Sequence, residues 1–237
     1  MTTTVKLALA NAEVNRLFTR KLPDGTRFYD AMMQKIAVLS TRAHEQQAYA
    51  LLALHHIQLS IQSTINAFDD ALDKYEGVLE KKKQVRGKAF TFEPRFHPTV
   101  SFSNRIAADL VTLYELCDKL ISTLKLLRAA GCFTNDDDYF NQARRYFKAV
   151  NQLLSQIVLT QVKTLPTITY ADVIDNADDY QKIVPLQGGI DCGWLYRAMT
   201  SNLAPRLHEA VRQPLLSRLK QRLELQLDPI KPFHEAH

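Results

Sequence analysis

Apolar residues recur at spacings of three and four over most of this chain, which is the pattern of amphipathic helices. Residues 28–83 contain no proline and one glycine, and their pattern predicts one helix to about residue 41 and a longer helix after it. A further helix is predicted over residues 105–130. The pattern therefore favours a mainly α fold, with several helices in one domain.

Residues with capping chemistry mark the ends of these helices. Asn104 or Ser103 is placed to cap the helix over 105–130, and Gly131 follows its last turn. Thr134, with an aspartate three residues later, predicts the start of another helix that runs to about Lys163. The last helical segment is predicted over residues 203–227, with breaks at Pro205 and Pro214.

Two segments alternate in the way that strands do. Residues 84–103 place Phe90, Phe92, Val100 and Phe102 among small polar residues, and they are the best strand candidate. Residues 3–9 alternate valine and leucine with lysine and alanine, which fits either a short strand or a loose arm. The predicted organisation is an N-terminal arm over 1–27, a helical core over 28–164 and a C-terminal helical extension over 165–237.

Composition narrows the class of protein. The chain has 237 residues, 46% of them hydrophobic, with 7 Gly and 9 Pro, which excludes general disorder and a turn-rich all-β fold. Its 3 Cys form no C-x-x-C pair, which argues against a disulfide framework and for a reducing compartment. We find no signal peptide and no long apolar run, so a cytoplasmic protein without membrane contact is expected.

Enzyme and metal signatures are missing from the sequence. The phosphate-loop, dinucleotide-binding, nucleophile-elbow and zinc-protease motifs do not occur. His55 and His56 are adjacent, so on a helix they diverge by about 100° and do not share a metal. Asp69 and Asp73 could hold a cation, but a solvated helix face explains them better. We therefore predict no enzyme, no cofactor and no metal.

Positive charge is concentrated in two stretches. Six Lys and Arg residues against two Glu lie between Glu80 and His97, and six against one Glu lie between Arg197 and Arg222. The whole chain carries a net charge of +5, so the rest of it is net acidic. Such segregation favours binding of a polyanion such as double-stranded DNA.

The order of elements in residues 99–160 refines this expectation. A short strand, a helix, a glycine turn and a capped second helix is the order found in ribbon–helix–helix DNA-binding proteins, here over residues 88–160. If Val100 and Phe102 face inward, the intervening hydroxyl residues face outward. The predicted DNA-binding residues are Lys81, Lys82, Lys83, Arg86, Lys88, Arg95, Thr99, Ser101, Ser103 and Arg105.

Residues 14–160 also resemble a known family. VNRLF near the start, FHPTVSFSNRIAADLVTLYELCDKLISTLKLLRAAG and the following YFNQARRYFKAVNQLL are similar to the AcaB family of transcriptional regulators, which occur in conjugative plasmids and integrating conjugative elements. The resemblance implies a DNA-binding activator of conjugation genes that forms a homodimer with ribbon–helix–helix character. The resemblance does not identify the operator sequence or decide between activation and repression. It also does not decide whether residues 3–9 or residues 88–103 form the dimer ribbon.

A second interpretation belongs to another functional class. The chain could be a helical adaptor or assembly protein of a conjugation apparatus, with the leucines of residues 215–227 as its partner-binding face. The same leucines fit an intramolecular core, which we favour. The expected partners are therefore double-stranded DNA, a second copy of the chain and, for an activator, the transcription machinery.

Overall fold

The chain is mainly helical, with one small antiparallel sheet of two strands, as the sequence predicts. The computed structural model describes residues 3–86, 92–102, 104–160, 162, 165, 167–175, 192–201 and 209–226, with the backbone alone at 83–86, 102 and 224–226. Two compact units divide the chain: unit 1 holds residues 1–37 and 56–160, and unit 2 holds residues 38–55 and 161–237.

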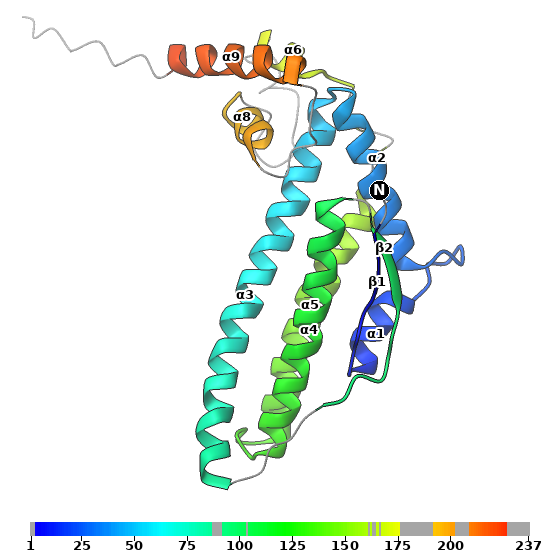
Figure 1. The fold of residues 1–237 in the computed structure, drawn as a ribbon, viewed down its shortest axis with the longest axis vertical. Helices are drawn as coiled ribbons and strands as arrows, with labels where there is room; N and C mark the ends of the chain where they lie inside the picture. Colours follow the sequence, from blue (N-terminus) through cyan, green and yellow to red (C-terminus); the bar gives the residue numbers. More distant parts are fainter. Residues whose placement is uncertain are drawn as a thin grey trace, which may run out of the picture. The chain divides into compact units, whose positions relative to one another are not determined.

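Unit 1 contains the sheet and most of the long helices (Figure 1). Its elements are β1 (Thr3–Lys6), α1 (Ala12–Thr19), the first part of α2 (Phe28–His44), most of α3 (Ala48–Arg86), β2 (Thr99–Phe102), α4 (Arg105–Ala129) and α5 (Asp136–Leu159). Helix α4 is central, because it packs against both α5 and α1. Helix α3 contacts α5 through aromatic rings, with the rings of Phe68 and Tyr146 edge to face at 5.3 Å.

Both ends of α4 follow the capping rules. The Asn104 side chain accepts a hydrogen bond from the Ala107 backbone N–H at 2.9 Å, which confirms one of the two predicted N-caps. Gly131 has a φ of +68°, as glycine allows just past a helix. The N–H groups of Gly131 and Cys132 donate to the carbonyls of Arg128 and Leu127 at 3.0 and 2.9 Å, which closes the helix as a Schellman motif.

Helix α5 begins one residue later than predicted. Its N-cap is Asn135, whose side chain accepts from the Asp138 backbone N–H at 2.8 Å, so the prediction of Thr134 as the cap is wrong. Asparagine caps at least as well as threonine, and only the backbone path selects between two neighbouring capping residues. The helix ends at Leu159, four residues before the predicted end near Lys163.

The two segments that alternate like strands pair with each other inside one chain. Strand β1 runs antiparallel to β2, with Thr3 opposite Phe102 and Lys6 opposite Thr99. The pairing continues less regularly, because the Leu7 and Leu9 N–H groups donate to the Pro98 and Phe96 carbonyls at 3.0 and 2.9 Å. We call residues 3–9 and 95–102 together the ribbon.

A buried polar cluster fixes the start of α1 on α4. The Asp118 carboxylate accepts from the backbone N–H groups of Ala10 and Asn11 at 2.8 and 2.9 Å, and from the Asn11 side chain at 2.9 Å. The Lys125 ammonium donates to the Asn11 side-chain oxygen at 2.7 Å. Asn11 and Asp118 are both almost fully buried. This cluster holds the first residues of the chain, and with them β1, against α4.

Among its described residues, unit 2 contains three shorter helices together with the end of α2 and the start of α3. They are α6 (Tyr170–Asp175), α8 (Cys192–Thr200) and α9 (Glu209–Gln226). Helix α9 packs on α8 and α6. Pro214 lies inside α9, so the predicted break there is wrong, while Pro205 lies outside the described residues.

The leucine face of α9 belongs to the core of unit 2. Leu215, Leu216 and Leu219 are buried, which confirms the favoured interpretation of these three residues, while Leu223 is half-buried and Leu227 lies outside the described residues. Within the part of the chain that the structure describes, no helix is long and apolar enough to cross a membrane.

Candidate nucleic-acid interface

The ribbon has an apolar side and a polar side. Val100, Leu7 and Leu9 are buried, at 2%, 0% and 0% exposure. Because side chains alternate along a strand, the residues between them point the other way. These outward side chains are exposed, and we call them the ribbon face: Thr4, Lys6, Arg95, His97, Thr99 and Ser101.

The chemistry of the ribbon face is cationic and hydroxyl-rich. Lys6 and Arg95 supply positive charge, and residues 3–9 and 95–102 contain no Asp or Glu. The hydroxyls of Thr4 and Ser101 are hydrogen-bonded across the two strands at 3.0 Å, which ties the two strands together on this side. Hydroxyl groups can bond base edges or phosphate oxygens, and Lys and Arg contact phosphates. The ribbon face therefore carries groups that can bind the phosphates and base edges of a nucleic acid.

The predicted site residues fall in three groups. Arg95, Thr99 and Ser101 lie on the ribbon face, and Arg105 is exposed at the first turn of α4, directly after β2. Lys81 and Lys82 are exposed on the last turns of α3. Figure 1 shows that α3 ends at the opposite end of unit 1 from the junction of β2 with α4. The structure therefore does not bring these two lysines to the ribbon.

The remaining predicted residues are not described in full. Lys83 and Arg86 lie in α3, where only the backbone is described, and Lys88 and Ser103 lie outside the described residues. Val100 faces inward, as predicted, while the side chain of Phe102 is not described.

Sequence reasoning missed three members of the ribbon face. Thr4 and Lys6 reach it only because β1 pairs with a strand more than 90 residues away in the chain. His97 was detectable, because it stands two residues from both Arg95 and Thr99 in the alternating pattern. The alternation of inward and outward residues, followed along residues 3–9 and 95–102 together, identifies all three.

The cysteine and metal-ligand residues of the described chain do not form a second site. Burial, with a smaller effect of the neighbouring Asp118 charge, raises the pKa of the Cys117 thiol to about 12. That thiol is therefore protonated at neutral pH and not nucleophilic. Among the described residues, no group of three or more His, Cys, Asp or Glu is arranged to hold a metal ion.

Comparison with known proteins gives one distant likeness in structure. No protein-family model matches the chain, and no curated protein matches it. The fold is similar to a crystal structure of AcaB from uropathogenic E. coli over 92% of this chain and 98% of that chain, with a TM-score of 0.49 and 12% sequence identity. A likeness this distant assigns neither a family nor a function to the chain.

Proposed function

We propose that this protein binds double-stranded DNA through its ribbon face and thereby regulates transcription. The observation that carries the proposal is the pairing of β1 with β2, which collects two cations, an imidazole and three hydroxyls on one exposed face without a carboxylate. Two paired strands are about 4.8 Å apart, and the major groove is about 12 Å wide and admits such a ribbon. The ribbon thus has the dimensions and the chemistry of a groove-reading element.

The residues of the face divide into two roles under this proposal. Lys6 and Arg95, with Arg105 at the start of α4, anchor the protein to phosphates and carry no sequence information. His97, Thr99 and Ser101 follow one another on the outward side of residues 95–102 and read base edges. In ribbon–helix–helix proteins the ribbon is shared by two chains, whereas here each chain forms its own pair of strands. Two copies would then read two half-sites.

The proposal about which genes are regulated rests on the sequence resemblance alone. Residues 14–160 resemble regulators of conjugative elements, so we propose activation of conjugative transfer genes as the specific role. The adaptor interpretation is the weaker alternative, because Leu215, Leu216 and Leu219, three of the five leucines of its partner-binding face, are buried within unit 2.

The test is binding of the full-length protein to fragments of conjugative plasmids at physiological salt. We expect retention of a subset of fragments in the presence of excess non-specific competitor. Combined Lys6→Ala and Arg95→Ala should weaken binding to every fragment and lower the salt slope by about two units, since each lost phosphate contact removes about 0.9. The matched control is Arg16→Ala with Lys21→Ala, two exposed cations of unit 1 outside the ribbon face.

Two results would contradict the proposal. Equal retention of all fragments would mean that the protein binds DNA without reading it, and no retention at all would favour the adaptor. An unchanged salt slope in the Lys6 and Arg95 variant, with DNA binding intact, would remove the ribbon face from the interface.

A further inference from the structure

Helix α5 has a cationic outer side that no prediction from the sequence included. Arg144, Arg145 and Lys148 are exposed, and the lysine follows the two arginines by one turn, so the three cations share one side of the helix. A shallow hollow of about 440 Å³ lies along this side. We call the residues that line it the α5 face: Asn141, Arg144, Arg145, Lys148, Ala149 and Gln152.

The positive charge of the α5 face is not neutralised by carboxylates. Residues 139–160 contain no Asp or Glu, and the three aspartates of the first turn of α5 precede the face. Among the described residues, no ion pair includes a cation of the α5 face, whereas Lys119 of α4 pairs with Glu76 of α3 at 3.0 Å. The face is therefore complementary to an anion.

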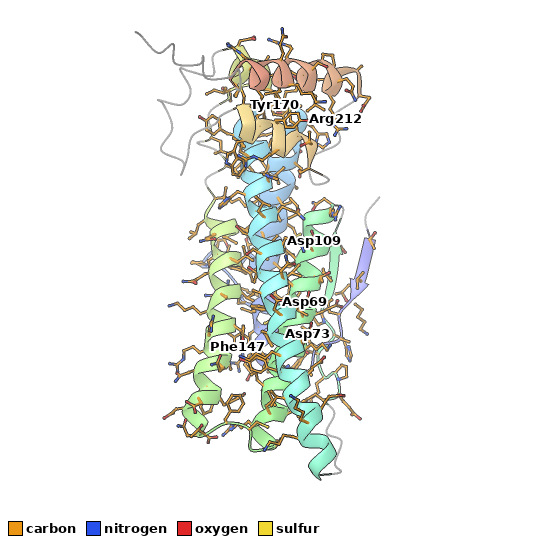
Figure 2. The ribbon with its side chains drawn as sticks, turned by 90° about the vertical axis from the view of Figure 1, so that its left-hand side faces the viewer. Asp69, Asp73, Asp109, Phe147, Tyr170 and Arg212 are labelled. Atoms are coloured by element: carbon orange, nitrogen blue, oxygen red, sulfur yellow. The ribbon has the colours of Figure 1, made fainter. Side chains whose placement is uncertain are left out.

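The α5 face and the ribbon face belong to opposite sides of unit 1. The opposite side of α5 is buried at Ala143, Val150 and Leu154, and the helix packs on α4, so the α5 face points away from α4. Figure 2 shows α5 on one side of α4 and β1 on the other. A duplex that lies on the ribbon face therefore leaves the α5 face accessible to another ligand.

The groups of the α5 face suit a nucleic acid better than an acidic protein. Arg and Lys contact phosphates, and the amides of Asn141 and Gln152 can donate to phosphate oxygens as well. These two amides are eleven residues apart, which is about 16 Å along the helix and enough to meet several successive phosphates. A protein interface also needs an apolar centre, and residues 141–156, all of them described, expose no large apolar side chain.

We propose that the α5 face binds a second duplex, so that one molecule bridges two segments of double-stranded DNA. The ribbon face reads the first segment, and the α5 face holds the other through its phosphates, whatever its sequence. The inference rests on the proposed function, because bridging uses the ribbon face as the first site. It adds an activity that binding of a single duplex does not provide, the joining of two separate DNA segments.

The test is capture of a second duplex by the full-length protein on a first one. A fragment that the protein retains is fixed to beads, the protein is added, and a labelled duplex of unrelated sequence follows. The wild type should hold the labelled duplex on the beads. Arg144→Glu with Lys148→Glu should bind the fixed fragment within about twofold of the wild type and capture about tenfold less labelled duplex, because two carboxylates then repel its phosphates.

The matched control is Arg16→Glu with Lys21→Glu, which changes the net charge equally but lies outside both faces. This control should capture as much labelled duplex as the wild type does. Circular dichroism establishes that each variant is folded.

Two results would overturn the bridging proposal and leave the proposed function intact. The first is a wild type that binds the fixed fragment and captures no labelled duplex. The second is equal capture by the wild type and the Arg144 and Lys148 variant, which would assign the second duplex to the ribbon of another copy and the α5 face to an acidic protein. The proposed function fails by a different result, a Lys6→Ala and Arg95→Ala variant that binds the fixed fragment as tightly as the wild type.

Discussion

The ribbon face and helix α5 both expose cations that form no ion pair within the described residues, but the groups beside these cations differ. On the ribbon, Lys6 and Arg95 stand among hydroxyls and an imidazole, and residues 3–9 and 95–102 contain no acid. On α5, the exposed cations Arg144, Arg145 and Lys148 follow three aspartates at the start of the same helix. Positive charge alone therefore does not identify the partner of a surface. The groups that stand beside the cations also decide which partner a surface suits.

The two surfaces also differ in what holds them in place. Helix α5 is a continuous element with its own N-cap, and its buried side packs on α4. The ribbon contains only two four-residue strands, and one of them is anchored through the Asn11–Asp118 cluster. Isolated two-stranded pairs are marginal in water, so the ribbon depends on that cluster and on its buried leucines. Changes in the core should therefore disturb the ribbon face before they disturb the exposed side of α5.

The largest effect is expected from Asp118→Ala. Without the carboxylate, the buried Asn11 N–H and the part-buried Ala10 N–H lose their acceptor, which should reduce the free energy of unfolding by about 3–5 kcal/mol. Urea unfolding measures the change. Asp118→Asn, which keeps an acceptor oxygen, should lose less, and Asp137→Ala on the surface should lose almost nothing. An Asp118→Ala protein with wild-type stability would show that the cluster does not anchor β1.

The long helices and the anchoring cluster differ in how far the sequence predicts them. Helices α3 and α4 follow from periodicity and local caps, because Asn104 and Gly131 act within a few residues of the helix ends. Helix α1 was missed. The side chain of its N-cap residue, Asn11, makes no capping hydrogen bond and instead donates to Asp118, 107 residues away. No local signal therefore marks the start of the helix.

The candidate site divides in the same way. The outward direction of Thr99 and Ser101 follows from alternation within one segment, while Thr4 and Lys6 join them only through a long-range pairing. The three aspartates at the start of α5 predict an acidic helix end, although the exposed side of that helix is basic about two turns later. Local chemistry is readable from the sequence, but which surfaces face the same way is not.

Leu9→Ala should give the next largest effect. Leu9 is fully buried under the ribbon, so its truncation should reduce the free energy of unfolding by about 2–5 kcal/mol and weaken DNA binding as the strands loosen. The comparison residue is Leu159 at the end of α5, which is 73% exposed, and Leu159→Ala should change stability by no more than about 0.5 kcal/mol. Thermal melts of both variants provide the measurement. Equal losses from the two leucines would contradict the difference in burial.

A smaller effect, confined to specificity, is expected from Thr99→Ala and Ser101→Ala. Loss of a hydroxyl that reads a base edge should change the ratio of affinities for two fragments by up to about tenfold, equal to about 1.4 kcal/mol. The salt slope should stay constant, since no phosphate contact is lost. Fluorescence anisotropy titrations with two labelled duplexes measure both quantities. If affinity for every duplex fell equally, these hydroxyls would be phosphate contacts and not readers of sequence.

The smallest effect is expected from Asp136→Asn, in the first turn of α5, and it should depend on pH. The Arg128 guanidinium, bonded to Asp136 at 2.8 Å, holds the pKa of that carboxyl below its usual value. A carboxyl with a depressed folded-state pKa stabilises the fold above its unfolded pKa of about 3.9, and this contribution is lost as the pH falls through the folded value. Asp136→Asn should therefore lower the melting temperature slightly at pH 7 and not at the acid end. Melts across that pH range, with Asp137→Asn as the control that keeps the Arg128 pair, measure the difference. A constant gap between wild type and Asp136→Asn at every pH would mean that the residue acts through helix capping alone.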